Sequence, residues 1–309
     1  MTKPKIILDC DPGHDDAVAL LFAARHTNLL GVTTVSGNVP LELTTHNALI
    51  TAQLLNLDVP VHAGADRPLV GKRIHAPDIH GESGLGGPKL PELTRQVASH
   101  DAVRYLVDTI RAHDNIWLVA VGPLTNVALA LRLAPDIADK LEGISIMGGS
   151  SSFGNTTPAA EFNIFADSEA ADVVFKSGVN LKMCGLNLTH QFDMQEPDVR
   201  KMREIGNRAG NFVADMLEFF ADAYAKRHTR PVTPLHDPCA VMALTHPELL
   251  TFEKRNVSVE LRGEHTRGMT VVDERGVRND LPQNVEVGMH IDREKAVEVL
   301  LETLRSYKD

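Results

Sequence analysis

The sequence lacks paired cysteines, an apolar run of membrane-spanning length and an excess of basic residues. Its 309 residues include only three cysteines, Cys10, Cys184 and Cys239, which form neither a disulfide framework nor a CxxC metal pattern. Cys10 and Cys184 stand in apolar segments, where we expect them to be small core residues. Cysteine chemistry is therefore not expected to carry the function.

Two further absences limit location and partners. No apolar run approaches the roughly 20 residues that cross a bilayer, and the first residues lack the apolar centre of a signal peptide. We therefore expect a cytoplasmic protein with no membrane partner. The net charge is -10, from 31 basic and 41 acidic residues. This balance argues against a nucleic-acid partner, because a nucleic-acid groove needs a basic face.

The most informative segment is the start of the chain, where an apolar run at residues 6–8 leads into four aspartates, Asp9, Asp11, Asp15 and Asp16. A Pro-Gly turn signal at 12–13 separates them, and an apolar helical pattern follows. Capping and the helix dipole explain acidic residues in a first turn, but not aspartates at a strand end. Because crowded like charges repel, we expect a hard cation with oxygen ligands here.

Strand-like and helix-like segments alternate through the first two-thirds of the chain. The strand-like segments are 5–9, 30–36, 59–63, 116–121, 144–147 and 181–186. The helix-like segments are 15–26, 41–56, 101–113, 124–133 and 168–177, followed by a mainly helical stretch at 195–228 with a break near 206–207. This alternation predicts an α/β fold with a largely parallel central sheet flanked by helices, a Rossmann-like open core.

The end of the chain reads differently. Strand-like segments at 256–262, 268–273 and 285–291 precede a helix at 293–307, and we interpret them as a C-terminal, antiparallel extension of the sheet. No repeat or linker divides the chain, so we expect a single domain over 1–309. The long irregular segments 64–100 and 148–167 are expected to be functional loops.

Several motifs together carry a family resemblance. The segment DCDPGHDDA at 9–17 resembles the opening motif of the calcium-dependent nucleoside hydrolases, the inosine-uridine-preferring family. Further resemblances follow in the same order: TTVSGN at 33–38, HGESG at 80–84, VGPLTN at 121–126, MGG at 147–149, GNTTPAAEFN at 154–163 and HDPCA at 236–240. The resemblance implies hydrolysis of the N-glycosidic bond of ribonucleosides to ribose and free base, through a transition state like an oxocarbenium ion.

The resemblance also implies a metal site and catalytic residues. Calcium would be held by Asp11, Asp16, Asp237 and the backbone carbonyl of Val121. Asp11 would be the general base for a water held by the calcium. His236 would protonate the leaving base, with a second histidine, His80, as the other candidate. Asp9 is not assigned to the metal.

The ribose-binding residues are also implied by the resemblance. Asp15 and Asn163 match residues on the 2′/3′ side of the sugar, and Asn155 and Glu161 match residues at the 5′-hydroxyl. Asp237 would serve both metal and sugar, and Asn38 is a further substrate-binding candidate. Because a carboxylate near the 5′ position would repel a phosphate, Glu161 favours nucleosides over nucleotides.

Base preference stays open at this point. The region before HDP is expected to form a lid beside the base, and its candidates are Tyr224, Arg227 and His228. Some pyrimidine-preferring relatives carry a Gln and a Tyr there, and counting back from His236 puts Tyr224 and His228 at those positions. Pyrimidine-only, purine-tolerant and non-specific activities all remain open, and so does a solvated, exposed helix with no such role.

Two other function classes are considered. The first is a magnesium-dependent phosphohydrolase that uses Asp9-x-Asp11; it leaves the Asn/Glu loop unexplained. The second is a non-catalytic, calcium-dependent nucleoside- or ribose-binding protein, against which the joint presence of Asp11, Asp16, His236 and Asp237 argues. By resemblance we also expect a homo-oligomer, a tetramer or dimer.

Overall fold

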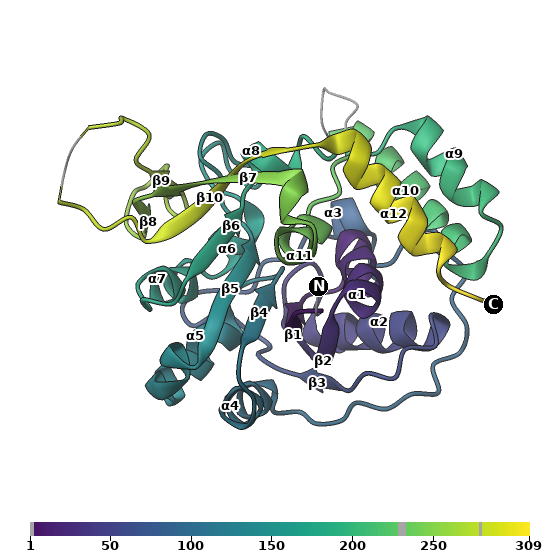
Figure 1. Ribbon diagram of the computed structural model, residues 1–309, viewed down its shortest axis with the longest axis horizontal. Helices are drawn as coiled ribbons and strands as arrows, with labels where there is room; N and C mark the ends of the chain where they lie inside the picture. The colour runs from purple at the N-terminus through teal and green to yellow at the C-terminus, as the bar shows by residue number, and fades with distance from the viewer. Residues whose placement is uncertain (1–2, 228–232, 278–279) are drawn as a thin grey trace.

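A mostly parallel sheet of eight strands forms the centre of the computed structural model, which describes residues 3–227, 233–277 and 280–309 (Figure 1). In sheet order the strands are β3 (Val61–Ala63), β2 (Asn28–Thr34), β1 (Lys5–Cys10), β4 (Ile116–Ala120), β5 (Leu141–Met147), β6 (Leu181–Cys184), β10 (Val285–Ile291) and β7 (Leu250–Arg255). The edge strand β7 runs antiparallel to β10. The predicted α/β fold class is thus confirmed.

Helices cover both faces of this sheet. The helices that precede β6 in the chain are α1 (His14–His26), α2 (Leu41–Leu54), α3 (Pro77–His80), α4 (Ala102–Ala112), α5 (Thr125–Leu133), α6 (Phe162–Ala166) and α7 (Ser168–Phe175). The later ones are α8 (Leu186–Thr189), α9 (Glu196–Glu204), α10 (Arg208–Arg227), α11 (Pro238–Thr245) and α12 (Arg293–Arg305), with 3₁₀ turns η1 (Pro135–Asp139) and η2 (Pro247–Leu249). The predicted helices of the first two-thirds are present, with ends displaced by a few residues.

The two faces of the sheet have separate cores. Along β1, Ile6, Leu8 and Cys10 pack into one core with α1 and α11, whereas Ile7 packs into the other core with residues of α4 and α5. This follows from the two-residue period of a strand, which sends successive side chains to opposite faces. Residues 6–8 are buried on both faces of the sheet, so this part of β1 is uninterrupted by polar residues, as the apolar run at 6–8 predicted.

The C-terminal part corrects one expectation. Residues 256–262 and 268–273 were expected to extend the main sheet, but they give β8 (Val257–Val259) and β9 (Thr270–Val272), a separate antiparallel pair that projects at one end of the molecule (Figure 1). β10 joins the main sheet parallel to β6, and the antiparallel edge strand β7 was not predicted. An alternating pattern identifies a strand with one buried face, but it does not identify the strand's partner.

The strand order places the functional loops. β1 lies between β2 and β4, with Asp9 in register with Thr33 and Ala120, and the order of connections reverses at β1 and β4. In open α/β sheets, ligands bind outside the carboxyl ends of the strands at such a switch point. The aspartate loop after β1 and the residue after β4, Val121, therefore meet at the place where a ligand is expected.

The structure also bears on the predicted helix break near 206–207 and on the two long segments predicted to be loops. The break near 206–207 is present, because α9 ends at Glu204, Gly206 has φ +76° and α10 begins at Arg208. The segments 64–100 and 148–167 are largely irregular, apart from the short helices α3 and α6. Within the described ranges, we find no helix with both the length and the apolar character needed to cross a bilayer.

Candidate active site

A pocket of about 190 Å³ opens at the carboxyl ends of the central strands. Nine residues that the sequence analysis proposed for the site line it: Asp15, Asn38, His80, Val121, Asn155, Glu161, Asn163, His236 and Asp237. They come from loops that are far apart in the sequence. Among the described residues that line the pocket there is no lysine or arginine, so no side chain in its wall supplies a fixed positive charge.

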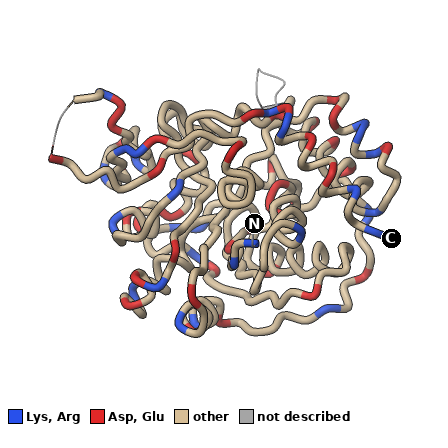
Figure 2. Tube along the Cα trace, viewed as in Figure 1, with Lys and Arg blue, Asp and Glu red and all other residues tan. Residues whose placement is uncertain are grey.

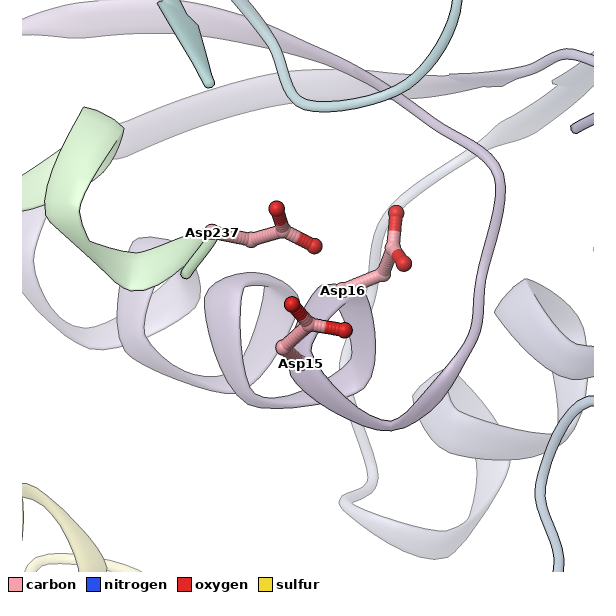
Figure 3. A group of neighbouring side chains, drawn as sticks. All are labelled: Asp15, Asp16 and Asp237. Carbon is pink, nitrogen blue, oxygen red and sulfur yellow. The ribbon is translucent and has the colours of Figure 1, made fainter. Parts of the chain in front are cut away.

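Three carboxylates converge at this pocket. Asp15 and Asp16 lie in the first turn of α1, and Asp237 immediately precedes α11, so that their side chains point toward one another (Figure 3). Each offers an oxygen, and these atoms lie within 4.8 Å of one another. All three residues are buried. This trio includes Asp15, which the sequence analysis had placed on the sugar rather than the metal.

Asp11 lies against this trio and is fully buried. Its Oδ2 accepts a hydrogen bond from the Asn38 backbone N–H at 2.6 Å, and its own N–H donates to Asp16 Oδ1 at 3.0 Å. Its other oxygen, Oδ1, is buried without a hydrogen-bond partner. A Cβ at Gly37 would lie 2.0 Å from Asp11 Oδ2, and one at Gly122 would lie 2.5 Å from Oδ1. Only glycine lets both backbones approach this carboxylate so closely.

Burial raises the pKa values of these carboxyl groups. Removal from water is the main cause for each, and the neighbouring carboxylates add to it for Asp11, Asp15 and Asp237. The pKa of Asp15 rises to about 8, and those of Asp11 and Asp237 rise well above the ordinary range. A divalent cation would favour the charged forms, and an unpartnered buried oxygen among acidic oxygens is the ligand set that a hard cation takes.

The polar side chains of the 148–167 loop are held by backbone groups. Asn163 Nδ2 donates to the carbonyls of Val121 at 2.8 Å and Met147 at 3.0 Å, which leaves Asn163 Oδ1 as a free acceptor in the pocket wall. Glu161 caps α6: Oε1 accepts from the Asn163 N–H, and Oε2 accepts from the N–H groups of Gly149 and Ile164. Burial raises the pKa of Glu161 to about 7.

Asn155 is oriented in a similar way. Its Oδ1 accepts from the Phe162 N–H at 2.9 Å, so the amide nitrogen is the group left to act as a donor. The wall therefore combines donors and acceptors, as a polyhydroxylated ligand requires.

The two candidate histidines are buried in different surroundings. His236 Nδ1 lies 2.7 Å from the Thr189 hydroxyl. His80 Nδ1 lies 3.1 Å from His14 Nδ1, and the two rings stack with centroids 5.3 Å apart. Burial lowers the pKa values of His80 and His236 well below the usual histidine value, so both rings are neutral at pH 7 in the free protein.

Asp9 is placed apart from the pocket. Its Oδ1 accepts hydrogen bonds from the Thr33 hydroxyl and from Asn126 Nδ2, and burial raises its pKa to about 7. Asp9 bonds to Thr33 of β2 and to Asn126 of α5, and neither Asp9 nor Asp11 is among the residues that line the pocket, so the pairing of the two that a phosphohydrolase would need gains no support. The lid candidates are not tested: the side chains of Tyr224 and Arg227, and the whole of His228, lie outside the described residues.

Comparison with known proteins decides the family. Residues 6–298 match the inosine-uridine preferring nucleoside hydrolases. The chain belongs to this family. It is 44% identical over 310 residues, 99% of each chain, to the pyrimidine-specific ribonucleoside hydrolase RihB of Escherichia coli O9:H4. A purine-preferring ribonucleoside hydrolase from Gardnerella vaginalis superposes with a TM-score of 0.91, at 31% identity over 98% of both chains. A plant nucleoside hydrolase, PpNRh1, gives 0.90 at 33% identity over 98% and 99%.

The protein is therefore a ribonucleoside hydrolase that cleaves N-glycosidic bonds, as the motifs predicted. The family is metal-dependent, and the acidic cluster of this hydrolase is the place in the described chain that suits a cation. The buried Asp11 Oδ1 without a partner is the structural observation that fits a metal best.

Two polar residues that sequence reasoning missed have contacts relevant to this hydrolase site. Thr189, which contacts His236, precedes it by 47 positions, and nothing local in its sequence marks that contact. His75 lines the pocket but stands outside every quoted motif. Its place in the long segment 64–100 is the only signal by which it could have been found.

Proposed function

We propose that this hydrolase acts on pyrimidine ribonucleosides in the pocket just described, and that residues 1–309 form a single nucleoside hydrolase domain. Support for the base preference comes from relatives. Identity to the pyrimidine-specific enzyme is 44%, whereas it is 31% to the purine-preferring structure and 30% to an inosine-guanosine nucleoside hydrolase. The observation that supports the location is the buried carboxylate cluster beside a polar wall to which the described chain contributes no lysine or arginine.

We propose calcium as the metal, held by Asp11, Asp16, Asp237 and the carbonyl oxygen of Val121. Oxygen ligands of this kind suit calcium, and the four groups come from the loop after β1, the first turn of α1, the residue after β4 and the residue before α11. Asp15 lies close enough to share this site. A bound divalent cation supplies a positioned, more acidic water and offsets the carboxylate charge.

Asp11 is the proposed general base. Its Oδ1 takes a proton from water while the water oxygen bonds to C1′ of the ribose. The bond between C1′ and the base nitrogen breaks, and its electron pair leaves with the base, which acquires a proton. The fixed Oδ2 supports this role, because the hydrogen bond from Asn38 holds the carboxylate in one orientation.

The ribose contacts are proposed for the remaining wall residues. Asp15, Asn163 and Asp237 bind the 2′/3′ side of the sugar. Asn155 and Glu161 bind the 5′-hydroxyl, and Asn38 completes the site near Asp11. The free Oδ1 of Asn163 and the free amide nitrogen of Asn155 supply one acceptor and one donor. Because neither Lys nor Arg from the described chain lines the pocket, a 5′-phosphate would meet no cationic side chain.

His236 is the proposed proton donor to the leaving base, with His80 as the other candidate and Tyr224, Arg227 and His228 as proposed lid residues. When the Thr189 hydroxyl donates to Nδ1 of His236, the ring proton lies on Nε2, where a neutral imidazole can donate to the base. His236→Ala should slow uridine hydrolysis strongly but barely affect 4-nitrophenyl riboside, whose leaving group departs without a proton. Equal slowing of both substrates would instead indicate a positioning role.

The function is tested by ribose release. The metal-free protein, prepared with a chelator, should be inactive and should recover with calcium, and uridine and cytidine should exceed inosine and guanosine in kcat/KM. Full activity in a verified metal-free sample would refute the metal site, and a purine preference would refute the base assignment. The homo-oligomer, a tetramer or dimer, and the cytoplasmic location stay predictions; sedimentation of the purified protein tests the former.

A further inference from the structure

His75 lines the pocket and has none of the roles assigned above. It lies in the irregular segment 64–100, two residues before α3, and is half-buried. The pocket wall also includes Ile74 and Phe165, whose side chains offer no hydrogen bond. A histidine beside these apolar side chains can distinguish one polar substrate atom from another.

The hydrogen bonding of His75 defines its tautomer. Nδ1 lies 2.8 Å from the carbonyl oxygen of Gly37. Because a carbonyl oxygen only accepts, Nδ1 must carry the proton, and in the neutral ring Nε2 is then an acceptor with a free lone pair. Gly37 is the single hydrogen-bond partner of the His75 side chain within residues 3–227, 233–277 and 280–309.

The ring is also held in place relative to the reacting groups. Next to it, the Ala76 N–H donates to the carbonyl of Asn38 at 2.9 Å, and the backbone of Asn38 donates to Asp11. Two hydrogen bonds from adjacent residues thus fasten this segment to the loop that orients Asp11. A side chain held in this way is pre-organised, and pre-organised groups lose little entropy when a ligand binds.

We propose that Nε2 of His75 accepts a hydrogen bond from an N–H or O–H group of the bound nucleoside, which makes His75 a further substrate-binding residue. This inference rests on the proposed function, since it requires a nucleoside in this pocket. The 2′- and 3′-hydroxyls of uridine are proposed above for Asp15, Asn163 and Asp237, and two further groups share the required donor chemistry: N3–H of the uracil ring and the 5′-hydroxyl. The experiment below separates them.

Two variants divide the roles of the two ring nitrogens. In His75→Asn the amide nitrogen occupies the place of Nδ1, so the bond to Gly37 is kept and the Nε2 acceptor is lost. In His75→Gln the terminal amide reaches the place of Nε2, so an acceptor is kept and the Gly37 bond is lost. We expect His75→Asn to lower kcat/KM for uridine by about 3- to 10-fold, the effect of one neutral hydrogen bond, mainly through KM. His75→Gln should lose less.

Substrate analogues identify the donor. The wild type and His75→Asn are compared on uridine, 3-methyluridine and 5′-deoxyuridine. The penalty of His75→Asn should disappear for the analogue that lacks the group bonded to Nε2 and persist for the other one. An equal penalty on all three substrates, or a larger loss in His75→Gln than in His75→Asn, would show that His75 acts only through Gly37 and overturn the proposal. Failure of the wild type to release ribose from uridine would overturn the proposed function, and this inference with it.

Discussion

Two groups of carboxylates in this protein differ in what offsets their charge. The active-site cluster consists of Asp11, Asp15, Asp16 and Asp237, and among described residues no lysine or arginine forms an ion pair with any of them. The helix α12 cluster consists of Asp193 and Asp198 around Arg293. The Arg293 guanidinium contacts Asp193 at 3.1 Å and also contacts Asp198. Lys and Arg are interspersed with Asp and Glu along the outer helices and around the β8–β9 pair (Figure 2).

The difference separates structural carboxylates from functional ones. In the α12 cluster the chain itself supplies the cation, and the ion pairs join α12 to α9 and the segment before it. In the active-site cluster, burial and mutual repulsion raise the pKa values of the carboxyl groups, so the charge is left for a ligand to offset. Substitutions in the active-site cluster should therefore alter catalysis, and substitutions in the α12 cluster should alter only stability.

The largest expected effect concerns the substrate. If the active-site cluster, its metal and Asn163 bind the ribose diol, a 2′-deoxynucleoside leaves buried polar groups without partners. Sites of this kind can discriminate by about 10⁴–10⁵. We therefore predict that kcat/KM for 2′-deoxyuridine falls below that for uridine by a factor in this range. Comparable kcat/KM values for the two substrates would refute the assigned sugar contacts.

The second prediction compares the same substitution in the two clusters. Asp11→Asn keeps the shape of the side chain but removes the proton acceptor, so turnover of uridine should fall by at least about 10²–10⁴-fold, as for other general bases. Asp198→Asn is the matched control, since it weakens a pair with Arg293 outside the pocket. It should leave turnover unchanged. Near-normal turnover in Asp11→Asn would mean that another group activates the water.

The third prediction concerns pH and metal. In the metal-free protein the pKa of Asp15 is about 8, raised from 3.8. The folded state therefore binds more protons than the unfolded state between these values, and this contribution to stability is present below about pH 4 and is lost as the pH rises toward 8. The proposed calcium would bind the charged forms and should oppose the loss. The rise in melting temperature on adding calcium should thus grow from about pH 5 to pH 8; a rise that does not change with pH would contradict it.

Sequence alone predicted the parts of the fold that local pattern controls. The apolar run at 6–8, the aspartates after it and the alternation of strands and helices were enough to predict β1, α1 and the parallel sheet. The pairing of the C-terminal strands was not predictable in the same way. Segment 250–255 contains the polar residues Thr251, Glu253 and Lys254, so its sequence does not have the apolar pattern of a buried strand. The alternating pattern of β8 and β9 is compatible with several strand partners.

The candidate site shows the same limit. Residues in the quoted motifs could be proposed because the motifs stand in order along the chain, and the structure brings nine of them to one pocket. The contacts of Thr189 with His236 and of His75 with Gly37 join residues 47 and 38 positions apart. Such contacts depend on how the sheet and its loops pack, so no local pattern in the sequence reports them.

The smallest expected effect, on stability alone, comes from the α12 cluster. Arg293→Met keeps much of the length of the side chain but leaves Asp193 and Asp198 without their cation. The Arg293 side chain is 23% exposed and that of Asp198 is 9% exposed, so these hydrogen bonds to charged groups are only partly screened by water. We expect the free energy of unfolding to fall by roughly 1–3 kcal/mol, measured by denaturant titration in the presence of calcium.

Arg104→Met is the control, since the ion pair of Arg104 with Asp108 is largely exposed and should contribute nothing measurable to the free energy of unfolding. Both variants should hydrolyse uridine like the wild type, because neither arginine lines the pocket. If Arg293→Met lowered turnover as Asp11→Asn is expected to do, the division between structural and functional carboxylates would fail.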